Sequence, residues 1–235
     1  MWDRLRPELE ARRVAHRCID LPGHGSERRS PWSVSLVDYG DAVVAAARAI
    51  DGPVLALGHS SGGFVVSQAA GRSPEAFAGL IYLAAFLPRS GERLIRLATR
   101  DRGSQLPPAM RFEPWRCRIR LDPARADGAL FHDCPAADRE TGLASLEPNP
   151  MRPGLSRVKL DARFDAIPKH YVFCTRDRAI SPEHQRWMAG RTRLASTHEL
   201  DCGHMPAYAA PAALADTLQA IVGQGIVGQA QPASH

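Results

Sequence analysis

With 235 residues, 44% of them hydrophobic, the chain has the length and composition of one globular domain with room for an insertion. No apolar run reaches membrane-spanning length and the first residues lack the apolar core of a signal peptide, so a cytoplasmic protein without a membrane partner is expected. The net charge of +5 comes from basic residues scattered among acidic ones rather than gathered into one stripe, so nucleic-acid binding is not expected.

The amino-terminal part predicts a helix, a strand and a second helix in turn. Residues 2–12 are expected to form a short helix, and residues 14–19 a strand that ends in a glycine-rich turn. Ser35 and Asp38 have the spacing of a capping box, and apolar residues then recur at helical intervals up to residue 50.

Four further strands are predicted, separated by helical segments. They lie at residues 53–57, 79–84, 170–174 and 196–200. Continuous apolar character, clearest in the second of them, is typical of a parallel sheet covered on both faces. A helix is expected to begin at Ser181, and the last helix follows the fourth of these strands. This alternation predicts an α/β fold with a doubly wound, mostly parallel sheet.

The middle of the chain has a different pattern. From residue 88 to residue 168 prolines are frequent and the periodicity is weak, which indicates a cap inserted into the core. The core then consists of residues 1–87 and 169–223, and the polar residues 224–235 are expected to form a flexible carboxyl-terminal tail.

The five cysteines form no C-x-x-C pair. Cys18 and Cys174 lie in apolar, strand-like runs, where buried thiols acting as small hydrophobic side chains are expected. No metal ion and no organic cofactor is expected.

The strongest functional signal is the run from Gly58 to Gly62, which reads Gly-His-Ser-Ser-Gly. It follows a predicted strand and precedes a predicted helix, the setting in which a G-x-S-x-G motif presents a nucleophilic serine, here Ser60, on a sharp turn. Gly58 and Gly62 lack a Cβ atom, so the strand and the helix are expected to approach closely around the strained serine.

A serine hydroxyl becomes a good nucleophile when a base takes its proton and a carboxylate orients that base. Asp177 follows the strand at 170–174, and His204 follows the strand at 196–200. Because the carboxyl ends of parallel strands meet at one edge of a sheet, Ser60, Asp177 and His204 are predicted to form a catalytic triad. Their order along the chain is that of the nucleophile-elbow hydrolases.

Two neighbouring residues are less suited to these roles. Asp201 is too close to His204 along the chain to orient its ring easily from the far side. His59 adjoins the serine, but its side chain is expected to point away from it. The remaining histidines have no matching context.

With these residues placed, the chain resembles the α/β-hydrolases of the plant-type methylesterase and hydroxynitrile lyase group, which has many bacterial esterase members. The resemblance rests on segments spread over nearly the whole chain. They are residues 20–25 (DLPGHG), 58–63 (GHSSGG), 82–88 (YLAAFLP), 131–134 (FHDC), 174–180 (CTRDRAI), 182–187 (PEHQRW) and 203–205 (GHM). The family's triad carries over to Ser60, Asp177 and His204.

The resemblance also implies a difference at the amino terminus. Family members begin with a strand and a His-Gly loop that supplies one backbone N–H of the oxyanion hole, whereas Met1 falls where the family enters its first helix. The chain is therefore expected to be truncated and to lack the strand between residues 14–19 and 53–57. The remaining donor would be the backbone N–H of Ser61, and losing one such donor typically lowers turnover about a hundredfold or more.

These features favour a serine hydrolase that cleaves a small carboxylic ester through an acyl-enzyme, with the ester as its partner. A hydroxynitrile lyase, which would use the triad for acid–base chemistry, is an alternative. The lyases of this group carry a lysine directly after the catalytic histidine, where this chain has Met205. A non-catalytic or degenerate ligand-binding protein of the same fold also stays open, as does a homodimer.

Overall fold

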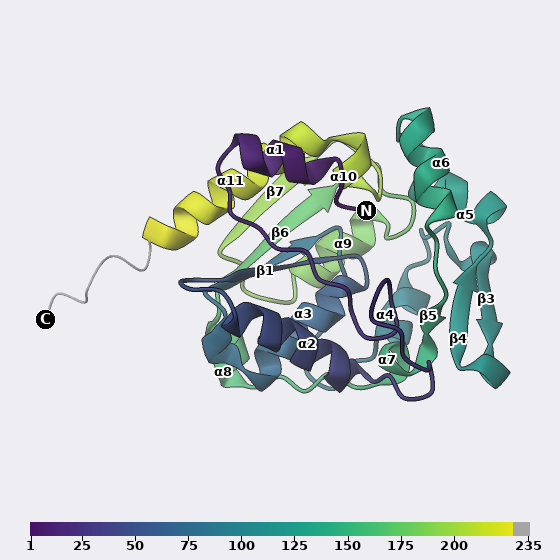
Figure 1. Ribbon diagram of the computed structural model, residues 1–235, viewed down its shortest axis with the longest axis horizontal. Helices are drawn as coiled ribbons and strands as arrows, with labels where there is room; N and C mark the ends of the chain where they lie inside the picture. Colours follow the sequence, from purple (N-terminus) through teal and green to yellow (C-terminus); the bar gives the residue numbers. More distant parts are fainter. Residues whose placement is uncertain (228–235) are drawn as a thin grey trace, which may run out of the picture.

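A parallel sheet with strand order β1-β2-β6-β7 forms the centre of the computed structural model, which describes residues 1–227 (Figure 1). The strands are β1 (Leu55–His59), β2 (Gly79–Leu83), β6 (Lys169–Cys174) and β7 (Ser196–Leu200). The four strands predicted for this sheet are confirmed, with bounds that shift by no more than two residues. Every residue of β2 and β6 is buried, as expected for the two inner strands of a sheet covered on both faces.

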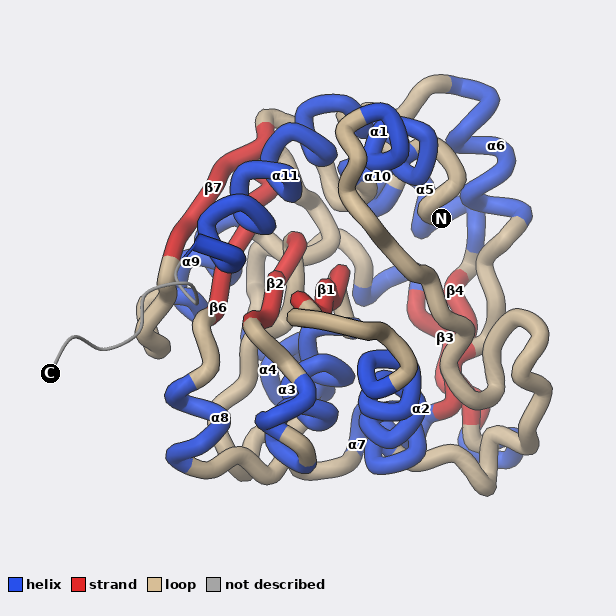
Figure 2. The backbone as a smooth tube through the Cα atoms, turned by 60° about the vertical axis from the view of Figure 1, so that its left-hand side comes forward, coloured by secondary structure: helices blue, strands red, loops and turns tan. Residues whose placement is uncertain are grey.

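Helices cover both faces of this sheet, and Figure 2 shows α1 and α11 on one side of it and α2 and α3 on the other. On the first side lie α1 (Leu5–Ala11) and α11 (Pro211–Val227), which pack on Ile81 and Val172. On the second side lie α2 (Leu36–Arg48), α3 (Gly62–Arg72) and α9 (Pro182–Ala189). The doubly wound α/β architecture predicted from the sequence is therefore confirmed.

The capping box predicted at the start of α2 is present. The Asp38 N–H donates to Ser35 Oγ over 3.2 Å, and the Ser35 N–H donates to Asp38 Oδ2 over 2.8 Å. These two bonds satisfy two backbone donors that a helix start leaves unpaired.

The prediction of a strand at residues 14–19 is wrong. The segment contains no strand, and its Ile19 is 37% exposed. Within the described residues β1 pairs only with β2, so no neighbouring strand offers the segment a ladder of backbone partners. Cys18 is exposed for the same reason and is not the buried thiol expected, whereas Cys174 is buried as predicted.

Most of the segment predicted as a cap forms its own small structure beside the sheet (Figure 1). It has an antiparallel sheet and two longer helices: β3 (Met110–Glu113), β4 (Arg118–Leu121), β5 (Asn149–Pro150), α5 (Pro123–Leu130) and α6 (Ala136–Ala144). Leu97, Val158 and Phe164, near the two ends of the segment, instead belong to the core under the main sheet. The domain boundaries at residues 88 and 168 stay a prediction.

Short helices complete the described chain. They are α4 (Leu94–Arg100), α7 (Met151–Leu155), α8 (Ala162–Ala166), α10 (Pro206–Ala209) and the single-turn helices η1 (Pro74–Ala76), η2 (Pro107–Ala109) and η3 (Pro114–Arg116). Because α11 continues to Val227, the predicted tail begins inside a helix, and its residues 228–235 lie outside the described residues. None of the helices within residues 1–227 combines the length and apolar character that crossing a bilayer requires.

Lys169 should contribute strongly to the stability of the fold, although it lies at the start of β6, the end opposite to the predicted catalytic residues. Its side chain is buried, and Nζ donates to the carbonyl oxygens of Phe164, Asp165 and Ile167 over 2.6, 3.2 and 2.8 Å. Burial lowers the pKa of Lys169 to about 8, so Nζ still carries three protons at pH 7.

Lys169→Met should therefore lower the free energy of unfolding by about 3 kcal/mol, because it removes the donor from three carbonyl groups at the end of α8. Urea denaturation at pH 7 measures this effect. The only other lysine, the exposed Lys159, provides the control, and Lys159→Met should change stability by less than about 0.5 kcal/mol. Equal losses in the two variants would contradict the role given to Lys169.

Candidate active site

Ser60 occupies a strained turn between β1 and α3. Its φ is +54°, in the left-handed region that non-glycine residues rarely adopt. A Cβ at Gly58 would lie 2.4 Å from the Gly62 carbonyl oxygen, and one at Gly63 would lie 2.3 Å from that of Phe86. The close approach predicted at Gly58 is therefore confirmed.

Gly62 takes part in this approach through its backbone, but the prediction that its missing Cβ permits the approach is wrong. A Cβ at Gly62 would meet no atom of another described segment within 4 Å. The second close approach is made instead by Gly63, whose backbone faces the chain that leaves β2. The sequence motif predicts that the turn requires glycine, but it does not distinguish which glycine lies against the neighbouring chain.

The structure brings Ser60, His204 and Asp177 together at the carboxyl ends of β1, β6 and β7. His204 Nε2 lies 2.9 Å from Ser60 Oγ, and His204 Nδ1 lies 2.8 Å from Asp177 Oδ2. His204 and Asp177 are only 2% and 4% exposed, so water has little access to the hydrogen bond between them. A hydroxyl, an imidazole and a carboxylate joined in this order can transfer a proton from the hydroxyl.

The carboxylate of Asp177 is held by three donors besides His204. The N–H groups of Ala179 and Ile180 donate to Oδ1 over 2.7 and 3.0 Å, and Gln185 Nε2 donates to Oδ2 over 2.9 Å. Because a carboxylate only accepts, His204 Nδ1 carries the proton. The lone pair of Nε2 in the neutral ring therefore faces the Ser60 hydroxyl.

His59 also belongs to the site, through contacts with His204 rather than with Ser60. Its Nε2–H donates to the carbonyl oxygen of His204 over 2.7 Å, and the two rings lie with their centroids 4.7 Å apart. Trp2 packs edge-on against the His59 ring at 6.3 Å. Burial, reinforced by the neighbouring His204, lowers the pKa of His59 to about 3. The ring is thus neutral at pH 7 and contacts His204 without adding charge.

His59 should make the protein less stable in mild acid. Its ordinary pKa is 6.5, so between pH 6.5 and about 3 the unfolded chain binds a proton that the folded chain does not, and the free energy of unfolding falls as the pH falls. His59→Gln keeps an N–H donor and removes this titration. We expect the loss of stability between pH 7.5 and 4.5, measured by urea denaturation, to be about 1–2 kcal/mol smaller in this variant than in the wild type. Parallel losses in the two proteins would contradict this assignment.

The other residues weighed from the sequence lie outside this hydrogen-bonded chain. Asp201 bonds to Thr175 and Arg176 at the surface instead of to His204. Ser61, whose backbone N–H is the predicted oxyanion donor, is an exposed residue directly after Ser60, and this N–H has no backbone acceptor within the described residues. Met205 is buried in the small core that the cap shares with α10.

Gln185 and His59 escape sequence reasoning because their contacts cross the fold. Gln185 lies on α9 and reaches Asp177 after the chain has turned back on itself. The available signal was weak: Gln185 follows the predicted helix start at Ser181 by one turn. That Gln185 donates to Asp177 can be seen only when α9 is placed against the end of β6.

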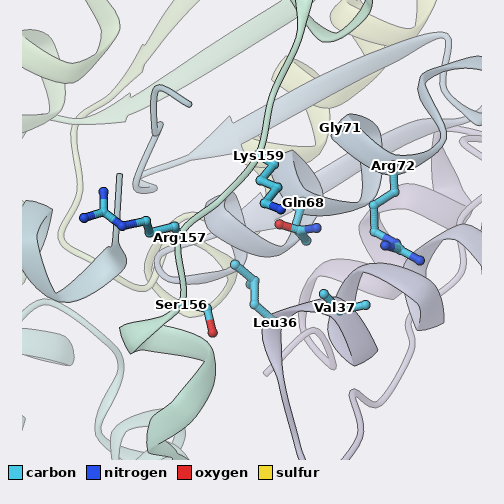
Figure 3. A pocket seen from close by; sticks show the side chains of 8 residues that line it. All are labelled: Leu36, Val37, Gln68, Gly71, Arg72, Ser156, Arg157 and Lys159. Atoms are coloured by element: carbon cyan, nitrogen blue, oxygen red, sulfur yellow. The ribbon is translucent and has the colours of Figure 1, made fainter. Parts of the chain in front are cut away.

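A cavity of about 450 Å³ lies away from these residues, at the far end of α3 (Figure 3). It is lined by Leu36, Val37, Gln68, Gly71, Arg72, Ser156, Arg157 and Lys159. Two of its three cations bond elsewhere, because Arg72 pairs with Asp41 and Arg157 donates to the Gly91 carbonyl. The rise of a helix puts this end of α3 about 15 Å from Ser60. Across residues 1–227 no group of three His, Cys, Asp or Glu side chains is arranged to hold a metal ion.

Comparison with known proteins identifies the family of the chain. A family model described as the alpha/beta hydrolase family matches residues 1–217. Methylesterase 1 of Arabidopsis thaliana is 27% identical over 234 residues, covering 92% of this chain and 88% of that protein. An alpha-hydroxynitrile lyase of the same plant is 25% identical over 239 residues, covering 94% and 91%.

A solved structure extends the likeness to three dimensions. The crystal structure of a pyrethroid hydrolase from Sphingobium faniae superimposes with a TM-score of 0.84 at 23% identity, covering 94% of this chain and 91% of that one. At this identity the match establishes the fold that the two chains share.

Proposed function

This chain belongs to the alpha/beta hydrolase family, and from that premise we propose that it hydrolyses a small carboxylic ester through an acyl-enzyme. The observation that carries the proposal is the unbroken hydrogen-bond chain from Ser60 through His204 to Asp177. The likeness to a plant methylesterase supports an ester with a small alcohol.

In the proposed first step Ser60 Oγ attacks the acyl carbon while His204 Nε2 takes the hydroxyl proton. The ester carbonyl oxygen becomes an oxyanion, and the backbone N–H of the exposed Ser61 is the donor we assign to it. His204 then gives its proton to the leaving alcohol, and the acyl group stays on Ser60.

In the second step a water molecule takes the place of the alcohol. His204 removes its proton, the water oxygen attacks the acyl carbon, and the returned proton restores the Ser60 hydroxyl as the acid leaves. Asp177 keeps the imidazole in the required tautomer and stabilises its charged form. The three further donors to Asp177 hold the carboxylate still during both steps.

The substrate is proposed to be small and partly apolar. The residues that pack between the cap and the loop after β7 are apolar, among them Phe131, Met205 and Tyr208. The residue after His204 argues against cyanide chemistry, because the buried Met205 stands where the lyases of this group carry a lysine, and a cyanide leaving group would lose that cationic partner. The cytoplasmic location stays a prediction.

A panel of p-nitrophenyl and methyl esters with acyl groups of increasing length tests the proposal. Release of p-nitrophenol or methanol, with preference for short or aromatic acyl groups, is expected. Mandelonitrile serves as the second substrate, and release of cyanide without ester hydrolysis would favour the lyase. Folded protein that turns over neither substrate would favour a ligand-binding role.

A further inference from the structure

We propose that Asp133, a cap residue between α5 and α6, is a positioning residue that fixes the loops carrying Asp177 and His204. The inference rests on the proposed function for its kinetic consequences, but its structural basis is independent of the substrate. The side chain of Asp133 is only 11% exposed, although it belongs to the cap and not to the sheet.

Asp133 reaches both loops with one oxygen. The Gly203 N–H donates to Asp133 Oδ2 over 2.6 Å, a short bond from a backbone group to a charged acceptor. Nη2 of Arg176 lies 3.6 Å from the same oxygen. Gly203 directly precedes His204 and Arg176 directly precedes Asp177, so one cap carboxylate contacts the residue before each partner of Ser60.

Arg176 also joins the two loops to each other. Its backbone N–H donates to the Cys202 carbonyl over 3.0 Å, and its Nη2 donates to the Asp201 carbonyl over 2.7 Å. The loops after β6 and β7 therefore move as one unit, and Asp133 is the point where the cap holds that unit.

Gly203 has no free space on the side that faces the cap. A Cβ there would lie 2.5 Å from Asp133 Oδ1 and 2.5 Å from His132 Cε1. The backbone directly before His204 thus rests against the cap, so a displacement of Asp133 moves the imidazole away from Ser60. A shift of about 1 Å in a reacting group can cost about a hundredfold in rate.

A second ion pair between the cap and the core provides a matched control. Asp138 on α6 accepts from Arg4 Nε over 2.7 Å and is 8% exposed. It resembles Asp133 in burial and in joining the cap to the core. Within the described residues it makes no hydrogen bond or ion pair to the loop of Asp177 or to that of His204.

The test compares Asp133→Ala, Asp133→Asn and Asp138→Ala by ester kinetics and by the low-field proton resonance of the His204 Nδ1–H. Asp133→Ala should lower kcat about 10- to 100-fold with KM changed less than about threefold, and it should shift or broaden the resonance. Asp133→Asn, whose amide oxygen still accepts from Gly203, should recover most of kcat. Asp138→Ala should lower Tm but leave kcat within about threefold and the resonance in place.

Several results would overturn the proposal. One is a folded Asp133→Ala protein with unchanged kcat and resonance, and another is an equal loss of kcat in Asp138→Ala. If Asp133→Ala does not fold, Arg176→Gln, which alters a half-exposed side chain, replaces it. This variant should lower kcat about three- to tenfold. An unchanged kcat and resonance would contradict the proposal that Asp133 and Arg176 together hold the two loops. If the wild type cleaves no ester but the resonance shifts only in the Asp133 variant, the positioning role stands and the proposed function fails.

Discussion

Ser60→Ala should lower ester hydrolysis by about 10⁴-fold or more while the protein stays folded. The variant removes the atom that forms the acyl-enzyme, and within the described residues Ser60 carries the one hydroxyl that bonds to His204 Nε2. Alanine can occupy the turn at a cost similar to that of serine, because both carry a Cβ at the φ of +54°. Initial rates on the preferred ester, together with circular dichroism, measure the two parts of this prediction.

The control for Ser60→Ala is Ser73→Ala, which removes a hydroxyl at the opposite end of the same helix. Its rate should stay within about threefold of the wild type. Substantial hydrolysis by folded Ser60→Ala would show that another group attacks the ester.

Asp177→Asn should lower kcat about 10³- to 10⁴-fold with little loss of binding. Four donors point at the Asp177 carboxylate, and an asparagine offers one acceptor oxygen in place of two. Its amide nitrogen would therefore face a donor, and His204 would lose the acceptor that keeps the proton on Nδ1. Nε2 would then carry a proton and could not take one from Ser60.

The exposed Asp51, in the turn before β1, provides the control for the charge change. Asp51→Asn should leave kcat within about threefold of the wild type. A similar kcat in Asp177→Asn and the wild type would mean that another group orients His204.

Part of this architecture could be predicted from the sequence because its signals are local. The strands of the parallel sheet could be predicted from apolar or strand-like runs. The Gly-x-Ser-x-Gly motif predicted the turn at which β1 ends and α3 begins. Parallel strands bring their carboxyl ends to one edge, so the meeting of Ser60, Asp177 and His204 followed from their places after three strands.

The features that escaped prediction depend on partners far away in the chain. Residues 14–19 have strand-like composition, but residues 1–227 offer them no neighbouring strand to bond to, so they stay irregular and leave Cys18 exposed. Composition also does not distinguish the role of Gly63 from that of Gly62. Asp133 bonds to a residue 70 positions later, and no spacing rule connects an acid in a proline-rich insertion to a glycine beside a catalytic histidine.

The most direct test of Ser60 as the nucleophile is its labelling by a fluorophosphonate, followed by intact and peptide mass spectrometry. The proposed chemistry predicts one adduct per chain, mapped to Ser60, formed rapidly at pH 7.5 and suppressed in His204→Ala. A folded protein that acquires no adduct, or acquires it on another residue, would contradict the assignment of Ser60 as the activated nucleophile.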